Sequence, residues 1–186
     1  MERTNFTFDK PEGWHIIKPE CYRDFSILST ELVPCVYAFA VDRPGGGYNV
    51  ISVFDYGEWE ESFINAYKNQ VEVMRENPEN TDSVNNFIEE NAEDFNVKTT
   101  SFMQPLFCKD GKFSGMNCLL SIMKIVTNMG ESYSLQAFVN FDGKCLCFGT
   151  SASQIDEEDP FNSIISRNDF IHDMFYKLIK SIKIVD

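Results

Sequence analysis

The feature that most constrains the fold is a meander of β-rich runs separated by hairpin turns. Asp110-Gly111 and Asp142-Gly143 each lie between runs of β-branched and aromatic residues, and an Asp-Gly pair in that setting favours a two-residue turn. Asn128-Met-Gly130 supplies a third turn. We therefore expect strands over about 98–108, 113–127, 131–141 and 144–151.

The second Asp-Gly pair also predicts a register, because a two-residue turn at 142–143 determines which residues face each other. The expected pairs on one face are Phe141 with Lys144, Val139 with Leu146 and Ala137 with Phe148. We expect this apolar face to meet the core. Cys145 and Cys147 then fall on the opposite face, across from Asn140 and Phe138.

Shorter extended segments occupy the first part of the chain. We expect strands at 6–8, 14–17, 36–41 and 49–54. The loop from Arg43 to Gly47 contains three glycines, but neither Lys-Ser/Thr nor a helix follows it, so we expect a hairpin connection rather than a phosphate cradle. Residues 20–33 have a mixed pattern that assigns no element.

Between these two sets of strands, apolar residues recur at three- and four-residue steps, which predicts a helix with one apolar face. Its apolar positions are Trp59, Phe63, Ala66/Tyr67, Gln70/Val71 and Met74. The helix should end at Asn77-Pro78, because proline cannot continue the hydrogen-bond ladder. A second helix, capped by Thr81 or Asp82, is expected to carry Val84, Phe87, Ile88 and Ala92, with its carboxylates on a solvated outer face.

An amphipathic helix is expected to close the chain over 169–182, capped by Asn168 or Asp169. Its buried stripe would be Ile171, Met174/Phe175, Leu178 and Ile182. This helix and the opening segment frame the strands between them.

Motifs at the two ends and in the middle of the chain resemble the PsbP-like family, named for an extrinsic subunit of photosystem II. They are Phe6-x-Phe-x-x-Pro-Glu-Gly-Trp14, Gly115 opening a long strand, and Asp169-Phe-x-x-x-Met-Phe-x-x-Leu-Ile-x-Ser-Ile182. The family's fold is also found in a Ran-binding nuclear import factor and in uncharacterised bacterial proteins. The resemblance implies an antiparallel sheet between helical layers, and a non-enzymatic binding or accessory module rather than a particular activity.

The expected architecture is therefore a single α+β domain over 1–186, with an antiparallel meander flanked by helices in a PsbP-like α/β/α sandwich. The physical argument agrees, because strands that are apolar on both faces need cover on both faces. A chain of 186 residues, 43% hydrophobic and with 17 Phe, is large enough to bury such a core.

The charge balance excludes one class of partner. The 29 acidic residues outnumber the 16 basic ones for a formal net charge of −13, and no local basic patch is evident, so nucleic-acid binding is disfavoured. We expect a solubilising acidic surface, with a basic protein partner as the sharper alternative. Apolar runs are too short for a membrane span, and the first residues show no signal peptide, although a removed signal is compatible with the sequence.

The six cysteines lie among strand-like apolar neighbours, which favours reduced core thiols and a cytoplasmic setting over a disulfide framework. Cys145-x-Cys147 lacks the further ligands that zinc requires, and Asp156–Asp159 lacks EF-hand spacing. The only two histidines limit acid–base chemistry: we expect His15 in a partial core and His172 on the surface. We therefore predict no catalytic residues, no metal site and no cofactor.

Three functional hypotheses follow. The first is a protein-interaction or accessory module, the second a carrier of a small apolar ligand between sheet and helix, and the third a hydrolase, against which the histidine count argues. The candidate binding residues for the first are Tyr56, Glu58, Trp59, Glu60 and Glu61. Here two aromatic residues, expected to be exposed, stand beside carboxylates, although Trp59 fits a core anchor equally well.

Overall fold

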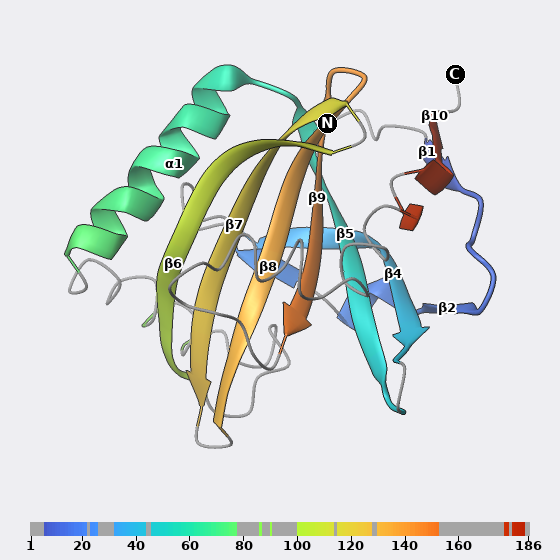
Figure 1. Ribbon diagram of the computed structural model, residues 1–186, viewed down its shortest axis with the longest axis horizontal. Coiled ribbons are helices and arrows are strands. Elements are labelled where there is room, and N and C mark those ends of the chain that lie inside the picture. Colours follow the sequence, from blue (N-terminus) through green and yellow to red (C-terminus); the bar gives the residue numbers. More distant parts are fainter. Residues whose placement is uncertain are drawn as a thin grey trace.

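One antiparallel sheet organises the protein (Figure 1). The computed structural model describes residues 6–21, 23–25, 32–43, 46–77, 86, 90, 100–113, 115–127, 130–152, 177–178 and 180–184. The strands are β1 (Phe6–Phe8), β2 (Trp14–Ile17), β3 (Arg23–Phe25), β4 (Leu32–Asp42), β5 (Tyr48–Glu58), β6 (Thr100–Phe113), β7 (Met116–Thr127), β8 (Gly130–Phe141), β9 (Lys144–Ala152) and β10 (Ile182–Ile184). The helices are η1 (Pro19–Cys21), a 3₁₀ turn, and α1 (Glu61–Glu76).

The main sheet has the order β2-β4-β5-β9-β8-β7-β6. β3 also pairs with β4, at residues 32–34, whereas β2 pairs with residues 38–41. Strands that follow one another in the sequence form the expected hairpins β4–β5, β6–β7, β7–β8 and β8–β9. The pairing of β5 with β9 joins the two halves of the meander, although α1 and three strands separate them along the chain. The sheet is therefore one continuous antiparallel surface, as the sequence predicted.

The register predicted at the second Asp-Gly pair is confirmed. Phe141 pairs with Lys144, and the pairs two and four residues further out are also as expected. Asp142 and Gly143 have φ of 51° and 83°, which is the pair of left-handed residues that a type I′ turn requires. A third turn was predicted at Asn128-Met-Gly130. Thr127 pairs with Gly130, so β7 and β8 form a hairpin there, while 128–129 lie outside the described residues.

The prediction of a turn at the first Asp-Gly pair is wrong. Asp110 and Gly111 lie within β6, opposite Leu119 and Cys118 of β7. The hairpin turns beyond Phe113, where Gly115 has a φ of +87°. Asp110 also forms an ion pair with Lys68 of α1 at 2.7 Å. Strand pairing that continues through both residues therefore outweighs the local turn preference.

Both faces of the main sheet are buried, which explains why successive residues of its central strands are apolar. One face, here called the α1 face, packs against the helix through Ile64, Tyr67, Val71 and Met74. It includes Cys145, Cys147 and Phe138. The opposite face includes Val139, Leu146 and Phe148 and also meets Leu178. The predicted helix is confirmed, and Asn77 follows its last residue. It begins only at Glu61, so Trp59 lies before it, and Ala66 is exposed.

The end of the chain differs from the predicted helix. Lys177, Leu178, Lys180 and Ser181 are helical, but Ile182 begins β10, which pairs with β1. Ile182 is nevertheless buried, as expected, because it lies opposite Phe8. The predicted cap and first part of this helix lie outside the described residues, as does the second predicted helix except for two of its positions.

The fold is thus α+β with a large antiparallel sheet and one long helix in the described part of the chain. It is richer in sheet than the predicted sandwich with helical layers. Figure 1 shows α1 beside the β6 end of the sheet, with the β1–β10 ribbon at the other side. No helix among the described residues has the length and apolar character needed to cross a bilayer.

Candidate functional site

The five predicted binding residues lie at the corner where β5 ends and α1 begins. A bulge interrupts the pairing of β5 with β9 between Asp55 and Glu58. Within it, Gly57 has a φ of +87°, a conformation that disfavours residues with a Cβ, and its N–H donates to Asp55 Oδ1 at 2.8 Å. The bulge redirects the strand, so that Glu58 faces Lys144 across the sheet.

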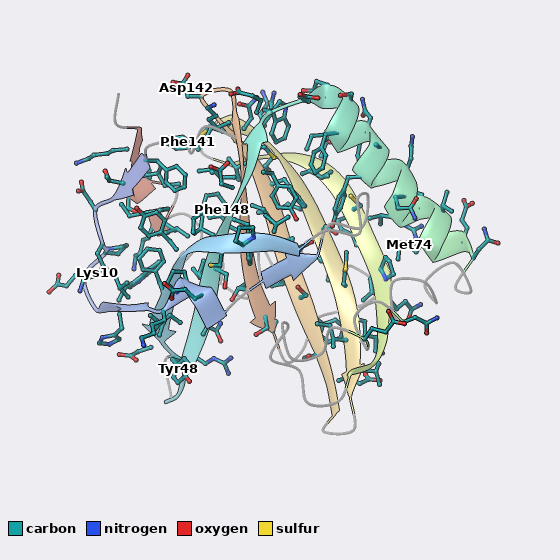
Figure 2. All side chains as sticks on the ribbon, turned by 180° about the vertical axis from the view of Figure 1, so that it is seen from behind. Lys10, Tyr48, Met74, Phe141, Asp142 and Phe148 are labelled. Atoms are coloured by element: carbon teal, nitrogen blue, oxygen red, sulfur yellow. The ribbon has the colours of Figure 1, made fainter. Side chains whose placement is uncertain are left out.

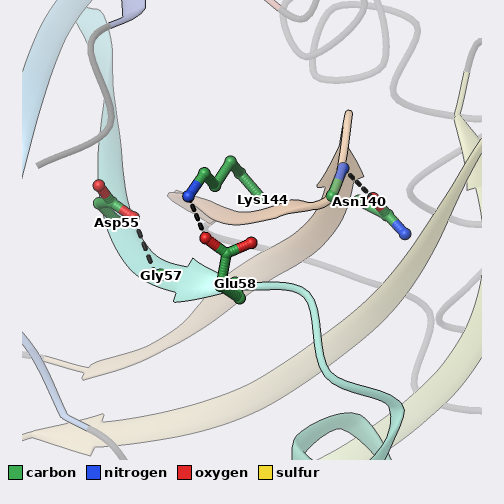
Figure 3. A network of polar contacts seen from close by, with 6 residues as sticks. Asp55, Gly57, Glu58, Asn140 and Lys144 are labelled. Carbon is green, nitrogen blue, oxygen red and sulfur yellow. Dashed lines mark hydrogen bonds and ion pairs between the residues drawn. The ribbon is translucent and has the colours of Figure 1, made fainter. Parts of the chain in front are cut away.

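A main-chain hydrogen bond joins the corner to the β8–β9 turn, and Figure 3 shows the Glu58–Lys144 ion pair beside it. The N–H of Trp59 donates to the carbonyl oxygen of Gly143 at 2.8 Å. Within that turn, the N–H of Gly143 donates to Asn140 Oδ1 at 2.9 Å. The corner is therefore joined to β9 by the pairing of Glu58 with Lys144 and to the turn by the Trp59 N–H.

Three carboxylates lie within two residues of Trp59 in the chain, and one of them bonds to its indole. Glu58 forms an ion pair with Lys144, drawn in Figure 3. The indole Nε1–H donates to Glu61 Oε1 at 2.9 Å, while Glu60 is the N-cap residue of α1. Carboxylates at the start of a helix interact favourably with its dipole. The corner therefore combines an aromatic ring with negative charge.

The two aromatic residues are less exposed than predicted, because both are half-buried and pack against the core of the α1 face. Tyr56 makes ring contacts with Phe63 and Phe138, at centroid distances of 5.6 and 5.2 Å. Tyr56 therefore packs the corner against the core of the α1 face. Trp59 has both roles that the sequence left open: it contacts the core, and its indole N–H bonds at the surface.

Sequence reasoning missed Lys144, Asn140 and Asp55. Lys144 follows a recognisable turn, but its partnership with Glu58 depends on the pairing of β5 with β9, for which no local pattern exists. The Asn140 and Asp55 side chains each cap a main-chain N–H two or three residues away, a habit of these residue types that could have suggested their role.

The histidine expected in a partial core is exposed. His15 lies on β2 with Nε2 3.7 Å from Asp42 Oδ2, and 65% of its side chain is accessible. His172 lies outside the described residues.

Five of the described cysteines are free thiols: Cys108 is half-buried, and the other four are buried, namely Cys35, Cys118, Cys145 and Cys147. Burial, followed by the charge of Asp55, raises the pKa of Cys145 to about 12. Burial likewise raises the pKa of Cys108 to about 12 and that of Cys118 to about 11. These three thiols are protonated at neutral pH, and a protonated thiol is a poor nucleophile.

Within the described ranges, no three His, Cys, Asp or Glu side chains are grouped so as to hold a metal ion. The Asp156–Asp159 cluster, considered for calcium, lies outside those ranges.

No protein-family model matches the chain, and no curated protein matches it significantly. Among solved structures, it is similar to cyanobacterial PsbP from Synechocystis sp. PCC 6803 at 10% identity and a TM-score of 0.49, over 97% of this chain and 86% of that one. The Saccharomyces cerevisiae Ran-binding protein Mog1p matches at 10% identity and a TM-score of 0.43, over 99% and 96%. LpqN of Mycobacterium tuberculosis, involved in cell envelope biogenesis, matches at 10% identity and a TM-score of 0.41, over 100% and 87%. PsbP, for which the family that the sequence motifs resemble is named, is thus among the similar structures. The likeness is one of fold alone.

Proposed function

We propose that the protein is a non-enzymatic interaction or accessory module that docks a basic partner surface at the corner formed by Tyr56, Glu58, Trp59, Glu60 and Glu61. The observation that carries the proposal is the half-exposed Trp59 indole, which donates to the Glu61 carboxylate, on a backbone that is hydrogen-bonded to the β8–β9 turn. A rigid aromatic anchor costs little entropy on binding, and tryptophan is prominent among residues that dominate interface energies.

The charge of the chain supports the basic character of the partner. A formal net charge of −13 would attract a cationic surface over several ångströms, and the corner places carboxylates where a lysine or arginine could approach the indole ring. Lys144 offsets part of that charge through its ion pair with Glu58. Binding at such an exposed site should weaken as salt rises, because salt screens surface charges.

Two finer points belong to the same proposal. Helical cover on both faces, as in an α/β/α sandwich, is supported by Leu178, a helical residue that packs on the face opposite α1. A cytoplasmic setting is supported by the free thiols, since disulfides are rare in reducing compartments.

The alternatives receive less support. For the ligand carrier, aromatic rings of α1 pack directly on the sheet: the rings of Tyr67 and Phe63 lie 4.7 and 6.2 Å from that of Phe138 on β8. For a cysteine hydrolase, the raised pKa of Cys108, Cys118 and Cys145 works against a thiolate nucleophile.

The test is capture of partners from source-cell lysate by the tagged chain, at low and high salt, with two variants. The corner variant carries Glu58→Gln, Glu60→Gln and Glu61→Gln. The control variant removes three exposed or half-exposed carboxylates elsewhere, through Glu72→Gln, Glu76→Gln and Glu131→Gln.

We expect a protein that the wild type and the control variant retain at low salt, that high salt releases, and that the corner variant fails to retain. Equal retention by both variants would contradict the choice of site. Recovery of nothing above background by the wild type would contradict the interaction module itself.

A further inference from the structure

The two ends of the described chain form a separate structure, here called the clasp, which consists of β1, β10 and the adjoining Asp9. Among the described strands, β1 pairs with β10 alone, through Phe6–Ile184, Thr7–Lys183 and Phe8–Ile182. The N–H of Asp9 extends this pairing by donating to the carbonyl oxygen of Ser181 at 2.8 Å, and Asp9 forms an exposed ion pair with Lys183. A two-stranded ribbon of this length is at best marginally stable by itself.

The clasp is held to the main sheet by aromatic packing rather than by strand pairing. The Phe8 ring lies 4.6 Å from that of Tyr37 and 5.4 Å from that of Phe39, both on β4. Phe6 lies 5.7 Å from Tyr37 and accepts a hydrogen bond at its carbonyl oxygen from Tyr37 Oη at 3.3 Å. Ile182 of β10 is also buried in this core. The described contacts that hold the ribbon to the rest of the fold are therefore the side chains of Phe6, Phe8 and Ile182 and one hydrogen bond to the sheet.

The connection from the clasp to β2 is suited to a hinge. It is a turn in which the N–H of Trp14 donates to the carbonyl oxygen of Pro11 at 3.2 Å, and Gly13 has a φ of +80°. Figure 2 shows this connection, with Lys10 at its outer side, lying away from the strands of the main sheet. Trp14, just after the turn, is buried against Phe39, so the rigid part of the protein begins there.

We propose that the clasp is a strap that opens locally: β1 separates from β10 and from Tyr37 and Phe39, while the main sheet stays closed. Local openings of this kind occur where few buried contacts and few backbone hydrogen bonds join a segment to the rest of the fold. Opening uncovers an aromatic floor on β4 that the closed clasp covers. Access to the Tyr37 and Phe39 rings therefore depends on whether β1 and β10 are paired.

Amide hydrogen exchange measured by NMR tests the proposal on the full chain, with the Asp9 amide as the reporter of the clasp and the amides of β8 and β9 as reporters of the main sheet. After correction for intrinsic rates, we expect Asp9 to exchange at least about 10-fold faster than the slowest sheet amides, because it opens locally. Exchange of Asp9 at the same rate as those amides would overturn the proposal.

A locked variant separates strand opening from smaller fluctuations. Thr7 and Lys183 are direct cross-strand partners with exposed side chains, and directly opposite residues of antiparallel strands have Cα atoms about 4.5–5.5 Å apart, within disulfide reach. We expect oxidation of the Thr7→Cys/Lys183→Cys variant to slow Asp9 exchange at least about 10-fold relative to its reduced form. No slowing in the oxidised variant would overturn the proposal.

Phe8→Ala provides an independent test that needs no disulfide. We expect it to accelerate Asp9 exchange about 10-fold while the β8 and β9 amides change much less, because the lost ring contacts belong to the clasp. Acceleration of all of these amides by the same factor would mean that the clasp opens only when the whole domain unfolds, and would overturn the proposal.

Discussion

Replacing Tyr67 by phenylalanine tests how α1 is held on the sheet. The Tyr67 hydroxyl lies in the buried interface between the helix and the α1 face, where it donates to Gln136 Oε1 at 2.9 Å and lies 3.4 Å from Ser121 Oγ. Both partners are buried. Tyr67→Phe keeps the ring and its contact with Phe138, but it removes the hydroxyl that makes both polar contacts.

The expected magnitude follows from burial. A net hydrogen bond contributes about 1 kcal/mol, and a buried acceptor deprived of its donor adds a desolvation cost, so the free energy of unfolding should fall by about 1–3 kcal/mol. In a chain of this size, each kcal/mol lowers Tm by about 2–4 °C. The assay is urea unfolding followed by circular dichroism, supported by a thermal scan.

Tyr48→Phe is the matched control, because Tyr48 is 63% exposed and its hydroxyl is available to water. We expect that variant to stay within about 0.5 kcal/mol of the wild type. A double-mutant cycle of Tyr67→Phe with Gln136→Met should give a coupling energy of about 0.5–1.5 kcal/mol. A loss below about 0.3 kcal/mol for Tyr67→Phe, or no coupling, would refute the role assigned to this hydroxyl.

Further predictions concern the β8–β9 turn and the buried thiols. Gly143→Ala should lower the free energy of unfolding by about 1–2 kcal/mol in urea melts, because its φ is +83° and nothing lies within 4 Å of an added Cβ, so the cost is backbone strain alone; an unchanged midpoint would contradict this. Cys108 and Cys145 should be alkylated by iodoacetamide at pH 8 at least about 100-fold more slowly in the native protein than in urea, because burial raises the pKa of each to about 12. Equal alkylation rates, measured by peptide mass spectrometry, would contradict this. Because the folded-state pKa values of these thiols and of Cys118 lie above the ordinary value of 9.0, stability should be complete below about pH 9 and fall as pH rises toward 11–12, as measured by urea unfolding along a pH series.

Local sequence predicted those parts of the fold that local interactions determine. The β8–β9 register follows from Asp142-Gly143, because both turn residues adopt positive φ and the strands continue directly from them. The α1 helix follows from its apolar period and from Pro78, which comes directly after Asn77. Neither conclusion needed knowledge of the rest of the chain.

Long-range contacts account for what was missed. Asp110-Gly111 carries the same turn signal as the later pair, but the ion pair with Lys68 and the long β6–β7 ladder keep it extended. Ile182 continues a helical period and yet pairs with Phe8 from the other end of the chain. Pairing across the chain cannot be inferred from a window of neighbouring residues.

The candidate site was predicted in composition but not in structure. The sequence placed Trp59 among carboxylates, whereas the bulge at Gly57 and the pairing of Glu58 with Lys144 depend on the β5–β9 register. His15 shows a similar limit: its place after Trp14 on a predicted strand suggested partial burial, but its side chain is 65% exposed beside Asp42.

The central claim is that Trp59 and its carboxylates form a docking site, and the most direct measurement is the Kd of a partner captured by the wild type, determined by calorimetry for wild type and Trp59→Ala. The account predicts that Kd rises at least about 10-fold in Trp59→Ala, as truncation of an interface anchor does, and that it rises with salt for the wild type. Circular dichroism of the variant must show the fold intact, because Trp59 also contacts the core. A Kd within about twofold of the wild type in a folded Trp59→Ala variant would contradict the account.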